Sequence, residues 1–117
     1  MKILVIDDDV EICEMLHIFF DSFGYQCLLT HTASEGLKQV VLYEPNIVFL
    51  DIRLPDKDGI TLLKEIKEIN KNLPVIIITG YRDAEKVIEG FRYGAVDCLL
   101  KPFNFDYIKN LLTHIKI

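Results

Sequence analysis

Five short apolar runs alternate with longer segments in which apolar residues recur at helical spacing, and this alternation limits the possible folds more than any other feature. The runs are residues 3–6, 27–29, 47–50, 75–78 and 96–100. They are nearly continuous rather than alternating with polar residues, which is typical of strands buried on both faces of a sheet. The sequence therefore predicts five buried strands separated by helices.

The segments between the runs carry apolar residues three or four positions apart, as one face of a helix does. These are Ile12, Leu16, Phe19 or Phe20 and Phe23 in the first predicted helix, Ile60, Leu63, Ile66 and Ile69 in the third, Val87, Ile88 and Phe91 in the fourth, and Ile108, Leu111, Leu112 and Ile115 in the fifth. The second helix begins after a capping box of Thr32 and Glu35 and ends near Tyr43. Asp83 and Asn104 are the expected N-caps of the last two helices.

Five such strand–helix units predict an α/β fold with a parallel sheet covered by helices on both faces. We expect a flavodoxin-like, doubly wound, five-stranded sheet in the order 2-1-3-4-5, counted along the chain, with five helices. In such a sheet, ligands bind beyond the carboxyl ends of the strands, where strands 3–6 and 47–50 lie side by side. The length of 117 residues predicts a single domain over 1–117.

Composition excludes several classes of protein. The net charge of −5 argues against binding of nucleic acid, because nucleic-acid binders neutralise phosphates with a basic face. The apolar runs are far shorter than the ~20 residues of a membrane-spanning helix, so no membrane insertion is expected. Cys13, Cys27 and Cys98 form no CxxC pair and are expected to be reduced thiols. Because Met1 and Lys2 lead directly into a strand, we expect a cytoplasmic protein.

Polar side chains follow four of the predicted strands directly. They are Asp7, Asp8 and Asp9 after the first strand, Asp51 after the third, Thr79 and Gly80 after the fourth, and Lys101 and Pro102 after the fifth. Two carboxylates about 4 Å apart repel by roughly 4 kcal/mol at an effective dielectric near 20, so clustered acids need a cation at neutral pH. Oxygen ligands with open positions suit Mg²⁺. Asp9 is instead expected to stabilise the start of the first helix.

These strand ends also carry short motifs in a fixed order. The motifs are VIDDD at 5–9, LDIRLPDKDG at 50–59, ITG at 78–80, GA at 94–95 and KPF at 101–103. Each motif is weak alone, but in this order and at these positions the whole chain resembles the receiver domain of bacterial two-component response regulators.

The resemblance implies a site for phosphoryl transfer. Asp51 is the expected phosphoacceptor, taking its phosphoryl group from a sensor histidine kinase or a histidine phosphotransferase. Mg²⁺, or Mn²⁺ in its place, is expected on Asp8 and Asp51 directly, on Asp7 largely through water, and on the backbone carbonyl of Arg53. Beyond self-phosphorylation and self-dephosphorylation, no enzymatic activity is expected.

The resemblance also implies a switch. Thr79, Gly80 and Lys101 are expected to hold the phosphoryl oxygens, and the bond before Pro102 is expected to be cis. Movement of Thr79 is expected to alter the face formed by the fourth helix, fifth strand and fifth helix. An unidentified output partner or effector domain would read this face, which is also a candidate homodimer surface. Family members usually have Tyr or Phe three residues before the lysine, where this sequence has Cys98, so the aromatic part of the switch is in question.

Further residues have candidate roles under the same resemblance. Tyr81 and Phe103 are the neighbouring aromatic residues that could replace the missing one. Arg53 and Tyr81, two residues past the acceptor and the threonine, occupy positions that tune phosphoryl lifetime in the family. Kinase docking is expected on the part of the first helix that falls outside the predicted inward stripe, namely Cys13, His17 and Ile18.

Two other functions fit parts of the pattern. A Mg²⁺-dependent phosphohydrolase with an aspartate nucleophile would use Asp7 and Asp9, but the 117 residues leave no segment for a cap over its substrate. A flavodoxin-like cofactor binder would need hydroxyls and amides after the first strand, where three aspartates repel phosphate. The sequence contains neither GxGxxG nor GxxxxGK[ST], which argues against dinucleotide and nucleoside triphosphate binding.

Overall fold

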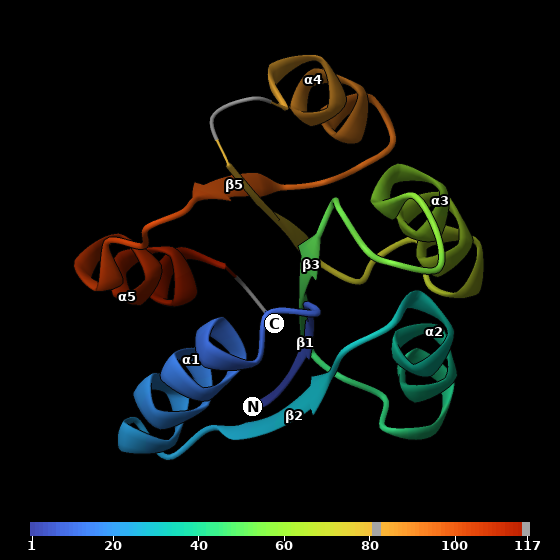
Figure 1. Cartoon of the computed structure of the whole chain (residues 1–117). Coiled ribbons are helices and arrows are strands. Elements are labelled where there is room, and N and C mark those ends of the chain that lie inside the picture. The colour runs from blue at the N-terminus through green and yellow to red at the C-terminus, as the bar shows by residue number, and fades with distance from the viewer. Residues whose placement is uncertain (81–82, 116–117) are drawn as a thin grey trace.

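The structure is a computed structural model, and it describes residues 1–80 and 83–115. Over this part of the chain, five strands alternate with five helices (Figure 1). The strands are β1 (Lys2–Ile6), β2 (Gln26–Thr30), β3 (Ile47–Asp51), β4 (Val75–Thr79) and β5 (Asp97–Leu100). The helices are α1 (Val10–Ser22), α2 (Ala33–Leu42), α3 (Gly59–Ile69), α4 (Ala84–Arg92) and α5 (Phe105–His114).

The strands form one parallel sheet in the order β2-β1-β3-β4-β5. β1 pairs with β2 on one side and with β3 on the other, so the winding direction of the chain reverses at this point. Helices α1 and α5 cover one face of the sheet, and α2, α3 and α4 cover the other (Figure 1). The predicted fold class, strand order and switch point are confirmed.

The core consists of two apolar layers, one on each face of the sheet. In β1, Ile3 and Val5 pack toward α1 and α5, whereas Leu4 and Ile6 pack toward α2 and α3. Every residue of β3 and β4 is buried. Burial on both faces explains why these strands are continuous apolar runs in the sequence.

Helix α4 contacts the sheet differently from the prediction. Ile88 and Phe91 were expected to face inward, but they are 56% and 46% exposed. Gly90 is the buried residue of α4, and a Cβ atom there would clash with the side chain of Ile77. The closest approach of α4 to the sheet is therefore at Gly90, which turns Ile88 and Phe91 toward solvent, and the prediction for those two residues was wrong.

Smaller differences lie at the ends of elements. β2 is one residue longer at each end than predicted, and β5 begins at Asp97 rather than Val96. Phe23 and Ile69 were expected to face inward but are 42% and 46% exposed, because they lie at helix ends where the chain leaves the core. Among the described helices, none combines the length and apolar character needed to cross a bilayer.

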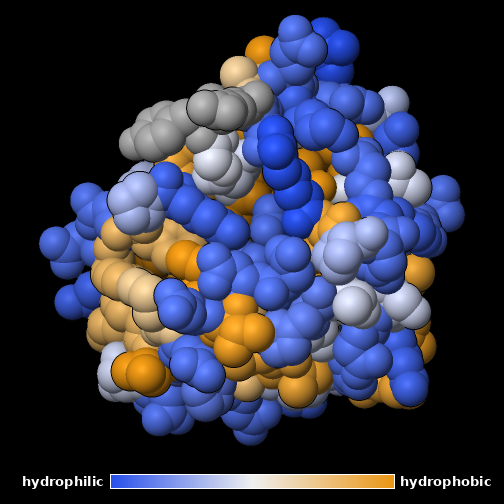
Figure 2. Space-filling model, in the orientation of Figure 1, coloured by the Kyte–Doolittle hydropathy of each residue, from blue (hydrophilic) through white to orange (hydrophobic). Residues whose placement is uncertain are grey.

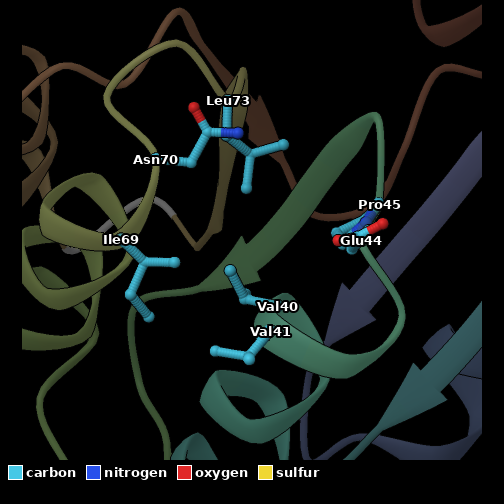
Figure 3. Close-up of a pocket in the computed structure, with 7 residues that line it drawn as sticks. All are labelled: Val40, Val41, Glu44, Pro45, Ile69, Asn70 and Leu73. Atoms are coloured by element: carbon cyan, nitrogen blue, oxygen red, sulfur yellow. The ribbon is translucent and has the colours of Figure 1, made fainter.

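Two surface features lie away from the carboxyl ends of the strands. A hollow of about 410 Å³ separates the end of α2 from the turn between α3 and β4, and its lining includes Glu44, Ile69 and Leu73 (Figure 3). On the opposite face of the sheet, hydrophobic side chains reach the surface over α1 and α5 (Figure 2). Met15 and Ile18 of α1 belong to this second surface.

Candidate functional site

The carboxyl ends of β1 and β3 bring three acids together. Asp7 and Asp8 follow β1, and Asp51 is the last residue of the neighbouring strand β3. Each of the three residues places a carboxylate oxygen within 4.8 Å of those of the other two. Asp7 and Asp51 are buried, whereas Asp8 is exposed. The acids that sequence reasoning expected at one crevice therefore do meet there.

Lys101, which follows β5, reaches into this cluster. Its Nζ lies 3.1 Å from Oδ2 of Asp7 and 3.3 Å from Oδ2 of Asp51. Burial opposes the charge on the ammonium, but the carboxylates of Asp7 and Asp51 outweigh it and raise the pKa of Lys101. The lysine therefore neutralises part of the negative charge of the acids.

Asp7 carries the most unfavourable buried charge of the site. Burial raises its pKa to about 7, and the nearby Asp51 adds to that effect, while a hydrogen bond from the backbone N–H of Asp9 and the charge of Lys101 act against it. Apart from its 3.1 Å contact with Nζ of Lys101, its buried Oδ2 atom has no polar partner within the described part of the chain. Three carboxylates gathered around a single ammonium leave an excess of negative charge that a hard divalent cation would neutralise, so the donor set fits Mg²⁺.

The loop after β3 is held in place by backbone contacts. The N–H of Arg53 donates to Oδ1 of Asp51 over 3.0 Å, and Arg53 forms an isolated antiparallel bridge with Asp58. Gly59 packs directly on the backbone of Ile52, where a Cβ atom would clash. The carboxylate of Asp56 in this loop accepts hydrogen bonds from the N–H groups of Ala33 and Ser34 at the start of α2, over 2.8 and 3.0 Å.

Thr79, at the end of β4, is buried, and its hydroxyl bonds to Asp83 rather than to an acid of the cluster. The distance from Oγ1 to Oδ2 of Asp83 is 2.8 Å. Arg53 binds the same carboxylate through Nε, 2.9 Å from Oδ1 and 3.1 Å from Oδ2, and through Nη2, 2.6 Å from Oδ1. The hydrogen bonds from Arg53 hold the pKa of Asp83 below its usual range, and the hydrogen bond from Thr79 adds a smaller effect in the same direction.

Sequence reasoning missed this role of Asp83. Asp83 does occupy the N-cap position of α4, as expected, but its side chain makes no capping hydrogen bond. The carboxylate is instead used by Arg53 and Thr79. The sequence does show that Asp83 lies four residues after Thr79. This spacing alone does not determine the direction in which the side chain of Asp83 points.

Of the other residues expected to take part in the switch, Cys98 packs on the face covered by α2, α3 and α4, and Phe103 on the face covered by α1 and α5. Gly80 is exposed, and the Lys101–Pro102 peptide bond is cis. Cys98 lines a hollow of about 460 Å³ beside Thr79 and α4. Phe103 instead packs with the layer of α1 and α5, with its ring centroid 6.4 Å from that of Phe105, so it does not fill the space next to Cys98. The other candidate, Tyr81, lies outside the described residues.

One docking candidate on α1 was wrong. Cys13 is fully buried, and its thiol donates to the backbone carbonyl of Asp7 over 3.2 Å. The inward stripe of α1 runs through Cys13, Leu16 and Phe20, because these positions face the sheet together. His17 and Ile18 are exposed, with Ile18 70% accessible, so they remain the surface part of the expected docking patch.

Fold and site together define a doubly wound α/β protein with a cluster of acids at the switch point of its sheet, joined by a lysine and by a threonine on the next strand. The family model described as the response regulator receiver domain matches residues 3–113. The chain therefore belongs to the receiver domain family and is a module of two-component signalling. This membership disfavours the phosphohydrolase alternative.

Similar proteins include both long regulators and single domains. The transcriptional regulatory protein ZraR of Escherichia coli strain K12 is 38% identical over 112 residues, which are 96% of this chain and 25% of ZraR. Sporulation initiation phosphotransferase F of Bacillus subtilis strain 168 is 36% identical over 93% of this chain and 88% of its own length. The receiver domain of NtrX from Brucella abortus superposes with a TM-score of 0.90 at 34% identity, covering 95% of this chain and 94% of that one. The chain spans about a quarter of the length of the transcriptional regulators that it matches.

Proposed function

We propose that Asp51 accepts a phosphoryl group from a phosphohistidine of a sensor histidine kinase or a histidine phosphotransferase. One observation carries the proposal: Oδ2 of Asp51 lies 3.3 Å from Nζ of Lys101, within a cluster formed with Asp7 and Asp8. A carboxylate surrounded in this way can act as a nucleophile toward phosphorus, because catalysis of phosphoryl transfer is mostly positioning and charge neutralisation.

In the proposed reaction, an Asp51 oxygen forms a bond to phosphorus as the bond from phosphorus to the histidine nitrogen breaks. The nitrogen keeps the electron pair, and the product is an acyl phosphate on Asp51. Asp8 and Asp51 would hold Mg²⁺ directly, Asp7 largely through water, and Arg53 through its backbone carbonyl. When bound, the ion neutralises charge on the phosphoryl oxygens.

Three further groups would bind the phosphoryl oxygens. The ammonium of Lys101 is a flexible point charge and would turn from Asp51 to a phosphoryl oxygen after transfer. The hydroxyl of Thr79 and the amide of Gly80 would donate to another oxygen. Hydrolysis of the acyl phosphate by the domain itself would return the site to its starting state, so the chemistry is self-phosphorylation and self-dephosphorylation.

The proposed output surface is the face formed by α4, β5 and α5. Large hydrophobic side chains are exposed on it, and they include Ile88, Phe91, Leu100 and Tyr107. We treat residues 1–117 as one receiver domain whose output partner or effector domain, or a second copy of the chain, binds there. The names of the similar proteins, transcriptional regulators and a phosphotransferase, support both an effector domain and a separate partner as the recipient.

The proposal is tested with acetyl phosphate and Mg²⁺ by intact-mass spectrometry. The wild-type domain is expected to gain one phosphoryl group and Asp51→Asn to gain none. Asp9→Asn is the matched control, because Asp9 belongs to the same acidic run but caps α1. Borohydride reduction followed by peptide mapping locates the acyl phosphate, and a label on Asp7 instead of Asp51 would support the phosphohydrolase reading.

A further inference from the structure

The hydroxyl of Thr79 is committed to Asp83 in this structure. A threonine hydroxyl has a single proton to donate. Its contact with Oδ2 of Asp83 measures 2.8 Å, whereas the contact with the carbonyl oxygen of Gly80 measures 3.1 Å. A hydrogen bond to a carboxylate is the stronger of the two kinds, and this one is buried. The proton is therefore not available to an anion on Asp51 until the bond to Asp83 breaks.

The same carboxylate fixes the direction of Arg53. The side chain of Arg53 is 66% exposed, so packing does not determine where its guanidinium points. Three hydrogen bonds of 2.6 to 3.1 Å to Asp83 do so instead. The backbone N–H of Arg53 meanwhile donates to Oδ1 of Asp51, so one residue contacts both Asp51 and Asp83.

Asp83 thus holds two donors from segments next to Asp51: Arg53 is two residues further along the chain, and Thr79 follows Ile78, the residue that pairs with Asp51 in the sheet. A phosphoryl group brings up to two negative charges and strong acceptor oxygens. The phosphoryl group would compete with Asp83 for the guanidinium of Arg53 and for the hydroxyl proton of Thr79. Asp83 is a buried acid at the start of α4, so losing these donors changes how the first turn of that helix is held.

We infer that Asp83 is a positioning residue of the phosphoryl site. It retains the hydroxyl of Thr79 and the guanidinium of Arg53 in the unphosphorylated domain, and it releases them when a phosphoryl group occupies Asp51. The inference rests on the proposed function of Asp51. Its consequence is that Asp83 weakens phosphoryl binding and so restricts the switch in the absence of a donor.

The test uses beryllofluoride, a tetrahedral analogue of the phosphoryl group, titrated by calorimetry into the domain with Mg²⁺ present. Asp83→Ala is expected to bind the analogue about tenfold more tightly than the wild type, because the competing acceptor is gone. In a Thr79→Val background, which removes the hydroxyl but keeps the shape, the gain is expected to fall to about threefold or less. In a Thr79→Ser background, which keeps the hydroxyl, the full gain is expected to return.

Two control variants separate this role from a general effect on α4. Lys86→Gln breaks the ion pair between α4 and Asp58 without touching Thr79, and it is expected to change binding by less than about twofold. Asp83→Asn keeps the volume of the side chain and cannot hold the guanidinium as an ion pair. It takes the place of Asp83→Ala if the alanine variant does not fold, with an expected gain of about threefold.

The outcomes are distinguishable. Binding that is unchanged or weaker in Asp83→Ala, or a gain that persists in full in Thr79→Val, overturns the inference and leaves the function of Asp51 standing. A wild-type domain that neither binds beryllofluoride nor accepts a phosphoryl group overturns the proposed function, and the inference with it.

Discussion

Helix α3 and the start of helix α4 lie on the same face of the sheet, but they are held by different forces. α3 buries five of its residues, Gly59, Ile60, Leu62, Leu63 and Ile66, against the apolar layer. Within α4 the buried residue is Gly90, and its first turn is tied by Asp83 to Arg53 and Thr79 and by Lys86 to Asp58. A buried apolar side chain has no alternative partner, whereas a polar group can exchange one hydrogen bond or ion pair for another. Stability therefore resides in α3, and adjustable contacts reside at the start of α4.

The largest expected effect is a loss of packing in α3. Leu63 is fully buried in the layer between the sheet, α2 and α3. Leu63→Ala is expected to lower the free energy of unfolding by about 3 kcal/mol, through lost burial and the cavity left behind. Urea denaturation measures the change. A loss below about 1 kcal/mol would contradict the view of α3 as the stable element.

A smaller loss is expected where α3 meets the loop after Asp51. A Cβ atom at Gly59 would clash with the backbone of Ile52 and with the carbonyl oxygen of Asp51. Gly59→Ala should therefore force a backbone shift and lower the free energy of unfolding by about 2 kcal/mol. The same shift should weaken Mg²⁺ binding, measured by calorimetry. Unchanged Mg²⁺ affinity would show that the loop does not transmit the strain to the acids.

Removing a charge from the acid cluster should instead stabilise the domain in metal-free buffer. The pKa of Asp7 is about 7 in the folded chain, against 3.8 for an ordinary aspartate. The folded state therefore binds this proton more tightly than the unfolded state, and folding becomes less favourable as pH rises from about 4 to about 7. Asp7→Asn is expected to raise the free energy of unfolding by about 1–2 kcal/mol at about pH 8 and by little at about pH 5.

Urea denaturation at both pH values checks that prediction, with Asp9→Asn as the control. Asp9 is the exposed neighbour that caps α1, so its replacement should show no comparable rise at the higher pH. Adding Mg²⁺ should stabilise the wild type more than Asp7→Asn, because the ion would neutralise the charge that the substitution removes. Equal pH dependence in wild type and Asp7→Asn would be incompatible with a buried, proton-binding Asp7.

The smallest expected effect is at the exposed side of α4. Ile88 is 56% exposed, so Ile88→Ala should change the free energy of unfolding by less than about 0.5 kcal/mol. Its effect should appear instead in binding of the output partner, which we propose to use this face. A loss of stability near that of Leu63→Ala would erase the contrast between the two helices.

The sequence predicted best where the type of sheet alone decides a residue's environment. β3 and β4 were predictable because strands buried on both faces leave no place for a polar residue, and the acids were expected to converge because parallel strands end at one edge. α1 was harder, because apolar residues cover more than one side of the helix. Only packing against the sheet decides that Cys13 faces inward and Ile18 outward.

The side-chain direction of Asp83 was beyond prediction for a related reason. An aspartate at a helix N-cap position normally bonds to the backbone of its own first turn. Here a guanidinium from the loop after β3 and a hydroxyl from β4 offer more favourable partners, and both come from distant parts of the chain. The orientation of α4 depended in the same way on contact between Gly90 and Ile77.

The anchoring of the loop after β3 by Asp56 and Asp58 has a mechanical consequence. Asp56 accepts hydrogen bonds from the backbone at the start of α2, and Asp58 caps α3 and also pairs with Lys86 of α4. The loop after β3 would therefore not move toward α2 or α3 to make room for a group added to Asp51. We expect the displacement on the side of Thr79 and Asp83 instead, where the contacts can exchange partners, so a local gain in volume at Asp51 would move the start of α4.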